Sequence, residues 1–266
     1  LNIYKSELLE DKEKLFSLSL KRYEVYSKNK AAFSSDNEDK EMILLYSLLY
    51  YAVQAEQFDF YRKHLKEYEK KFLRTRNHKI DRQEAKNGFH SLKMNFEYKI
   101  GNIKESEKYA ERVFQYFRET EYGQNKDELL AFYFQYAKIL YEGKNYHKAL
   151  EVSNIIANHE YKTVRYDILA YTHFLEMFIH FELKNFQLVR SYILAISRKL
   201  SHHKEKELSE KIILKLLYEL TSDAKKDEGF IIKKYYKKIT ALKKNKYERP
   251  FFNELPVDKW VLKKIS

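Results

Sequence analysis

Two histidines and a glutamate lie close together in the segment HFLEMFIH, where His173, Glu176 and His180 are spaced to share one face of a helix. Helical zinc sites commonly use ligands four residues apart. The two histidines here are seven residues apart, which is about 10.5 Å along a helix axis at 1.5 Å per residue. One ion does not easily bridge that distance, so we expect no metal site and interpret these residues as a polar face lining a groove.

The sequence lacks the other common signatures of catalysis. It contains no Gly-rich phosphate loop, no HExxH and no G-x-S-x-G element. The absence of cysteine excludes a thiol nucleophile, disulfides and thiolate metal ligands. We therefore expect a protein that is not an enzyme and that needs no cofactor.

Lysines are concentrated between residues 231 and 249, and four of them form two adjacent pairs, Lys233, Lys234, Lys237 and Lys238. A basic patch interleaved with tyrosines can bind nucleic acid or an acidic partner through counterion release and stacking. The net charge of +12 fits this reading, but Lys far outnumbers Arg, as an AT-rich codon bias would produce. The apolar residues of the segment follow a helical period, which favours an amphipathic helix with solvated lysines. Nucleic-acid binding is kept as an alternative.

The elements that carry these residues are predicted to be helices. The 266 residues include 5 glycines and 2 prolines, whereas average usage gives roughly 18 and 13. So few turn residues argue against folds with many strands and favour long helices with short connections. With 44% hydrophobic and 34% charged residues the chain is globular. We predict an all-α fold.

One short pattern recurs along the chain and predicts helical hairpins. A periodic helix ends in one or two small or polar residues, and an apolar residue then opens a second helix, at Phe58, Ile103, Tyr146 and Phe186. The intervals are 45, 43 and 40 residues, which indicates a helical-repeat array. In the third turn we expect Gly143 to adopt the positive φ that ends the helix.

The predicted hairpins define one domain over residues 1–266. It comprises N-terminal capping helices in 1–36, four stacked antiparallel hairpins in 37–200, and a C-terminal hairpin with a capping tail in 201–266. Stacking is needed because one hairpin buries only a single apolar stripe. The tail carries both prolines, and we expect it to turn back onto the last hairpin with Phe251, Phe252, Trp260 and Leu262.

The hairpins resemble tetratricopeptide repeats. The third matches best, with Tyr133, Tyr136, Ala137, Leu140, Tyr146 and Ala149, and the first matches with Leu45, Leu48, Leu49, Ala52 and Phe58. The second and fourth fit after the first helix is shifted by one or two residues, so we expect slightly longer turns there. The spacing exceeds the family's 34 residues, and its closing proline is absent. The chain is similar to tetratricopeptide-like proteins of Bacteroidetes. The resemblance implies a right-handed superhelix.

The resemblance also implies where a partner binds. In a tetratricopeptide array the first helix of each hairpin lines the concave, partner-binding face. The residues of this chain at the corresponding positions are Phe134, Lys138 and Tyr141 in the third hairpin and Phe181 in the fourth. A groove of this composition suits a peptide with apolar side chains and a carboxylate. Alternatively, these aromatics fill the space between repeats. We predict a protein- or peptide-binding scaffold, with partner and oligomeric state left open.

The location and wider context of the chain rest on weaker signals. No apolar run approaches the ~20 residues of a membrane-spanning helix, and no signal peptide is visible. We expect a cytoplasmic protein. Because the chain begins at Leu1, we expect a leader or further domain before it. This suggests a second alternative, in which the array is a sensor that regulates an effector domain outside this chain.

Overall fold

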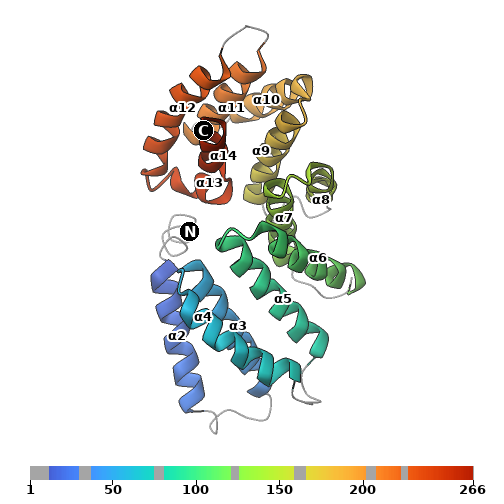
Figure 1. Ribbon diagram of the computed structural model, residues 1–266, viewed down its shortest axis with the longest axis vertical. Coiled ribbons are helices and arrows are strands. Elements are labelled where there is room, and N and C mark those ends of the chain that lie inside the picture. The colour runs from blue at the N-terminus through green and yellow to red at the C-terminus, as the bar shows by residue number, and fades with distance from the viewer. Residues whose placement is uncertain are drawn as a thin grey trace. The chain divides into compact units, whose positions relative to one another are not determined.

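The computed structural model describes residues 12–29, 37–74, 81–120, 126–158, 166–201, 208–222 and 227–265 (Figure 1). Every regular element in these ranges is a helix, and none is a strand, which confirms the predicted all-α class. The chain divides into two compact units, Leu1–Gln124 and Asn125–Ser266. Each is described by itself, and the single superhelical array over the whole chain stays a prediction.

The first unit is built from two hairpins and a flanking helix. Its elements are α2 (Lys12–Lys28), α3 (Asn37–Gln54), α4 (Phe58–Tyr68), the π-helical turn η2 (Glu69–Arg74), α5 (Arg82–Lys99) and α6 (Ile103–Glu119). The hairpins α3–α4 and α5–α6 are neighbours because α3 packs against α5, and α2 packs against α3. The rest of the predicted capping region in 1–36 lies outside the described residues.

Aromatic rings and close helix approach organise the core of the first unit. Tyr61 stacks on Phe96, with ring centroids 4.6 Å apart. The Tyr68 hydroxyl donates to the Ala85 carbonyl oxygen at 3.2 Å. A Cβ at Gly88 would lie 2.8 Å from the Tyr68 hydroxyl oxygen, a distance that real Cβ contacts do not reach. Glycine at position 88 therefore lets α5 pass close to this tyrosine.

The second unit contains the other two predicted hairpins and the C-terminal elements. They are α7 (Lys126–Glu142), α8 (Tyr146–Asn158), α9 (Tyr166–Glu182), α10 (Phe186–Ser201), α11 (Leu208–Thr221), α12 (Glu228–Lys243), α13 (Arg249–Glu254) and α14 (Val257–Ile265). Helices consecutive from α7 to α12 pack in pairs, and α7 also packs against α9. This pattern confirms stacked antiparallel hairpins, and α11 also packs against α12.

Four hairpin turns share one geometry. The second helices begin at Phe58, Ile103, Tyr146 and Phe186, as predicted. Two residues before each start, φ is positive, at Glu56, Gly101, Lys144 and Lys184. The backbone N–H of the next residue donates to the carbonyl oxygen five residues earlier at 2.8–2.9 Å, which is the hydrogen bond typical of a Schellman motif. The donor–acceptor pairs are Gln57–Ala52, Asn102–Glu97, Asn145–Leu140 and Asn185–His180. The four turns therefore have equal length.

Two expectations about these turns were wrong. The positive-φ residue of the third turn is Lys144 and not Gly143, because Gly143 still donates its N–H to the Ile139 carbonyl at 2.9 Å as the last part of the helix. The second and fourth turns are no longer than the others. The shift in their apolar pattern therefore arises within the first helices.

Helices α7 and α9 form the centre of the second unit. On α7 every residue at 132–134 and 136–141 is buried, and α9 is buried at 172 and 174–179. A helix that is apolar on all sides must be covered on more than one side. The helices α8 and α10 cover one side, and the C-terminal segment α13–α14 covers another. Figure 1 shows α14 between α12 and α9.

The tail folds back onto earlier helices, and three of the four residues expected to pack there are buried. Phe251, Phe252 and Trp260 are buried, whereas Leu262 is 47% exposed. The buried residues of α14 are Val257, Trp260 and Val261, which follow a helical period along one face. Leu262 lies off that face and is about half exposed, so it is not part of the buried stripe.

Candidate functional site

The four residues predicted to line the groove lie on the two central helices of the second unit. Phe134, Lys138 and Tyr141 follow one another at one-turn spacing on α7, and Phe181 lies near the end of α9. Their exposed fractions are 4, 5, 7 and 6%. They are therefore covered, and the cover includes the chain's own C-terminal segment.

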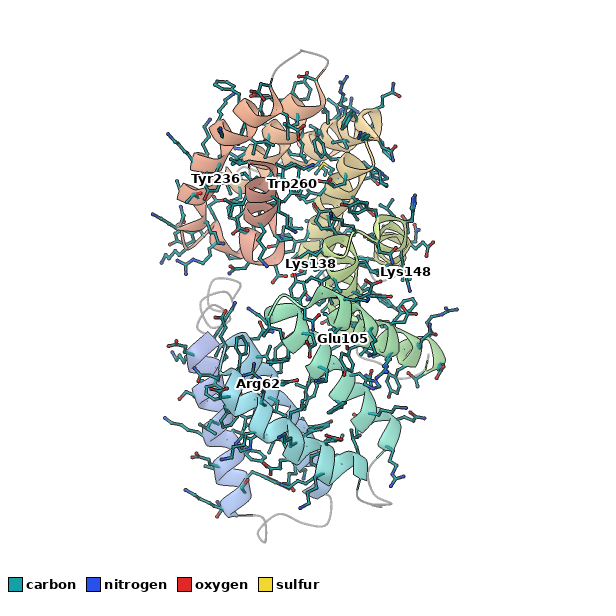
Figure 2. All side chains as sticks on the ribbon, viewed as in Figure 1. Arg62, Glu105, Lys138, Lys148, Tyr236 and Trp260 are labelled. Atoms are coloured by element: carbon teal, nitrogen blue, oxygen red, sulfur yellow. The ribbon has the colours of Figure 1, made fainter. Side chains whose placement is uncertain are left out.

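Lys138, which is labelled in Figure 2, forms a charged contact with this segment. Its Nζ donates to Glu254 Oε2 of α13 at 3.3 Å, and the same ammonium lies 5.0 Å from the centroid of the Phe134 ring. A buried ammonium is costly unless it has a carboxylate or a ring face to offset lost hydration. Lys138 has both, and Glu254 itself remains 47% exposed.

Aromatic pairs join α9 to the C-terminal segment. The α9 residues Tyr171, Phe174, Phe178 and Phe181 repeat every three or four positions and so share one face. Phe251 meets Phe174 edge-on at a centroid distance of 5.1 Å. Trp260 of α14 meets Phe178 at 5.1 Å and Phe181 at 5.4 Å. Such T-shaped pairs add about 0.5–1.5 kcal/mol each beyond area burial.

Glu182, at the end of α9, makes a second polar contact with the C-terminal segment. Here α9 provides the carboxylate and α14 provides the donors, whereas in the first contact α7 provides the cation. The Trp260 indole N–H donates to Glu182 Oε1 at 2.6 Å. Lys264 Nζ lies 3.2 Å from the same oxygen and 5.5 Å from the Phe181 ring centroid. The face of α7 and α9 thus offers one cation, one carboxylate and an aromatic stripe. We call this surface the α7–α9 face.

Tyr141 is a buried polar residue on α7, one turn after Lys138. Burial, and after it the negative charge of Glu182, raises the pKa of Tyr141 well above its ordinary value of 10. The phenol therefore stays protonated at any physiological pH. Its ring lies 5.9 Å from that of Tyr146 at the start of α8, so Tyr141 joins the two helices of the third hairpin as well as supporting the α7–α9 face.

The histidine–glutamate cluster of α9 packs against α10. Glu176 is 3% exposed, and its Oε2 lies 3.2 Å from His173 Nδ1. Tyr192 of α10 covers the cluster, with ring centroids 6.4 Å from His173 and 5.9 Å from His180. Burial and then Glu176 raise the pKa of Tyr192 to about 12. The polar face therefore contributes to the packing of α9 against α10.

The described residues hold no metal-ligating group of three or more His, Cys, Asp or Glu side chains. In the same part of the chain, none of the helices has both the length and the apolar character needed to cross a membrane.

The predicted basic patch lies on the outer side of α12. Lys233, Lys234, Lys237 and Lys238 are all exposed. Lys234 pairs with Glu219 of α11, with Nζ 2.8 Å from Oε1. The buried Tyr235 donates its hydroxyl to the same carboxylate at 2.7 Å, so this tyrosine is not available to stack on a base. The arrangement fits an amphipathic helix, and the nucleic-acid role of the lysines stays a prediction.

Sequence reasoning missed which surface the tail covers. The aromatics at 251, 252 and 260 signalled a buried tail, but the partners Glu182 and Glu254 carry no local signature. Trp260 is separated from Glu182 by 78 positions and Lys138 from Glu254 by 116. Helical periodicity reports the buried side of each helix and gives no information on which distant helix covers it.

Comparison of the chain with protein-family models, with curated proteins and with solved structures returned no match.

Proposed function

We propose that this protein is a non-catalytic scaffold that binds a protein or peptide segment on the α7–α9 face. The observation that carries the proposal is the way this face already holds a short helical segment, α13–α14. It does so with aromatic anchors and with charges of both signs, the combination that dominates binding energy in protein interfaces. Helix-in-groove recognition uses the same elements.

We further propose that the hairpins are tetratricopeptide-like. The support is the sequence pattern of the third hairpin together with the four equal Schellman turns. In such arrays the first helices of successive hairpins form a common surface. Here these helices are α7 and α9, which pack against each other. A sensor that regulates an effector domain outside this chain would use the same face.

The proposal is tested by selecting peptides from a random library with the full chain. We expect the selected peptides to combine aromatic residues with a carboxylate that Lys138 recognises. Replacing that carboxylate by an amide weakens binding to the wild-type chain. In the Lys138→Met chain, which keeps an unbranched side chain one atom shorter and removes its charge, the preference disappears.

The matched control is Lys237→Met, an exposed position on α12. This chain keeps the carboxylate preference of the wild type if Lys138 is the recognition residue. Two results would overturn the proposed function. One is the absence of any selected peptide, and the other is a Lys138→Met chain that retains the preference.

Nucleic-acid binding by α12 is the second candidate. The observation that favours it is the exposure of four lysines on two successive turns of one helix. Contacts to phosphate release counterions and would make binding strongly salt-dependent.

A further inference from the structure

The chain's own C-terminal segment shows which ligand chemistry the α7–α9 face accepts. We propose that the external partner is a helical segment of the same chemistry and that it binds by displacing α13–α14 from this face. The segment carries two aromatic anchors nine residues apart, as Phe251 and Trp260 are. It has a carboxylate three residues after the first anchor and a cation four residues after the second, as Glu254 and Lys264 are. This inference rests on the proposed function.

Two sets of contacts hold α13–α14. One set faces α7 and α9 and includes Phe251, Glu254, Trp260 and Lys264. The other set ties the segment to α11 and α12. Glu248, which immediately precedes α13, accepts from the backbone N–H groups of Leu208 at 3.0 Å and Ser209 at 2.8 Å. Asp258 of α14 pairs with Lys243 of α12.

This separation allows release without unfolding of the C-terminal elements. When the first set breaks, α13 and α14 remain attached to α11 and α12 through the second. Local openings of this kind cost less than global unfolding and are the usual source of lids and exchangeable segments. The partner therefore competes only for the first set of contacts.

Lys138 is the strongest sign of a recognition role. A helix core position can be filled by an apolar side chain, which is often at least as stabilising as a buried ion pair. The α7 helix instead places an ammonium there, with 6% of its side chain exposed, facing a carboxylate whose side chain is 47% exposed. Because Glu254 lies at the edge of the contact, a rival carboxylate can approach Lys138 while Glu254 moves into solvent.

The fluorescence of Trp260 reports directly on displacement of α13–α14, because Trp260 is the one tryptophan of the chain. In the docked state its ring is buried between Phe178 and Phe181, and its N–H is bonded to Glu182. Displacement moves the indole into water. The fluorescence emission of Trp260 then shifts to longer wavelength, and acrylamide quenches it more strongly because the indole is exposed.

The experiment titrates the full chain with a synthetic peptide of residues 249–265 that carries Trp260→Phe, so that only the protein's own indole emits. We expect a saturable red shift of Trp260 emission. A control peptide that also carries Phe251→Ala and Glu254→Lys produces no shift. A Trp260→Phe chain gives no signal with either peptide, which shows that the emission comes from Trp260 of the protein.

Two full-chain variants separate competition from simple binding. Glu254→Gln weakens only the internal segment, so the peptide should bind this chain about three- to fivefold more tightly than the wild type. Glu254 is half exposed, and the variant is expected to fold. In Lys138→Met, the peptide and its Glu254→Gln version should bind equally, because the cation that distinguishes them is gone.

The outcomes distinguish this inference from the proposed function. If selected peptides bind with a Lys138-dependent carboxylate preference while Trp260 emission stays unchanged, the scaffold role holds and the displacement of α13–α14 is overturned. Equal affinity of the wild-type and Glu254→Gln chains for the peptide also overturns displacement. If no peptide of any origin binds, the proposed function fails together with the inference.

Discussion

Lys138 and Glu254 are 116 residues apart in the chain, yet Nζ of one lies 3.3 Å from Oε2 of the other. This pair joins α7 to α13 and marks the place where the C-terminal segment covers the α7–α9 face. A half-exposed ion pair contributes at most about 1 kcal/mol. Burial of Phe251 and Trp260 contributes about 1.5–3 kcal/mol each. The aromatics therefore supply most of the stabilisation of the docked segment, and in the proposed recognition the charges select which segment binds.

Replacing Glu182 tests the second polar contact of this face. Glu182→Ala leaves the Trp260 N–H and Lys264 without their carboxylate. Hydrogen bonds to charged groups are worth about 1.5–3 kcal/mol, less where solvent reaches them. We expect the free energy of unfolding in urea to fall by about 1–2 kcal/mol. Lys237→Ala, on the exposed side of α12, should change it by less than about 0.5 kcal/mol, and equal losses in both variants would contradict this assignment.

Glu248 should act as a cap of α11 supplied from 40 residues away. Its carboxylate accepts from the N–H groups of Leu208 and Ser209 and from the Ser209 hydroxyl at 2.7 Å. Glu248→Ala exposes these donors without a partner, and we expect a loss of about 1–3 kcal/mol. Hydrogen exchange provides the local check, since the amides of Leu208 and Ser209 should exchange faster while those of α7 do not. Unchanged protection at these two amides would refute the capping role.

Gly88 is expected to tolerate no larger side chain while Tyr68 is present. The Cβ of Gly88→Ala would meet the Tyr68 hydroxyl oxygen at 2.8 Å, so this variant should lose about 1–3 kcal/mol of stability through overpacking. The Tyr68→Phe background removes the obstructing atom. The same substitution should therefore cost clearly less there, and a double-mutant cycle measures the difference. An equal cost in both backgrounds would show that the clash is not the cause.

The positive-φ lysine of the third turn offers a stabilising substitution. Lys144 has φ of 63°, a region that disfavours residues with a Cβ by roughly 1–2 kcal/mol. Lys144→Gly relieves this strain but adds chain entropy to the unfolded state. We expect a net gain of up to about 1 kcal/mol in thermal or urea unfolding. Lys144→Ala retains the Cβ and should give no gain, so a gain of the same size in Lys144→Ala would rule out backbone strain as its source.

His90 should make the first unit sensitive to acid. Burial, followed by the positive charges of Arg112 on α6 and Lys86 on α5, lowers the pKa of His90 to about 4. The unfolded chain binds its proton near pH 6.5, so between these values the unfolded state holds more protons. The contribution of neutral His90 to the free energy of unfolding is therefore complete above pH 6.5, and it is lost as the pH falls towards 4. Because the ring is only half buried, we expect a loss of about 1–2 kcal/mol.

The pH prediction is checked by comparing wild type with His90→Gln at pH 7 and pH 4.5. Other groups that titrate in this range affect both chains alike. The wild type should therefore lose more stability than His90→Gln on acidification. An identical loss in the two chains would show that His90 is not responsible.

The basic side of α12 is tested with the combined replacement of its four lysines, Lys233→Glu, Lys234→Glu, Lys237→Glu and Lys238→Glu. If these residues bind nucleic acid, the wild type binds at low salt, its affinity falls steeply as salt rises, and the variant loses binding. A variant that binds DNA or RNA as well as the wild type would eliminate this candidate. Binding of the selected peptides should be unaffected, because the lysines lie on the outer side of α12.

Much of the fold could be predicted because it is encoded locally. The starts of α4, α6, α8 and α10 follow from an apolar residue after a short polar turn, and the buried stripe of each helix follows from its period. The conformation of Lys144 could not be predicted in this way, because lysine has no preference for positive φ and glycine precedes it. The sequence also did not predict that α13–α14 covers the α7–α9 face. Pairs such as Trp260 with Glu182 depend on which distant elements meet, which periodicity does not report.

The most direct test of the account is the affinity of the full chain for one peptide in two forms, with a carboxylate or an amide at the position that Lys138 contacts. We predict that the wild-type chain prefers the carboxylate by about fivefold, which corresponds to about 1 kcal/mol. The Lys138→Met chain should bind both forms equally. A wild-type chain without this preference, or a Lys138→Met chain that keeps it, would contradict the claim that the α7–α9 face is a binding site.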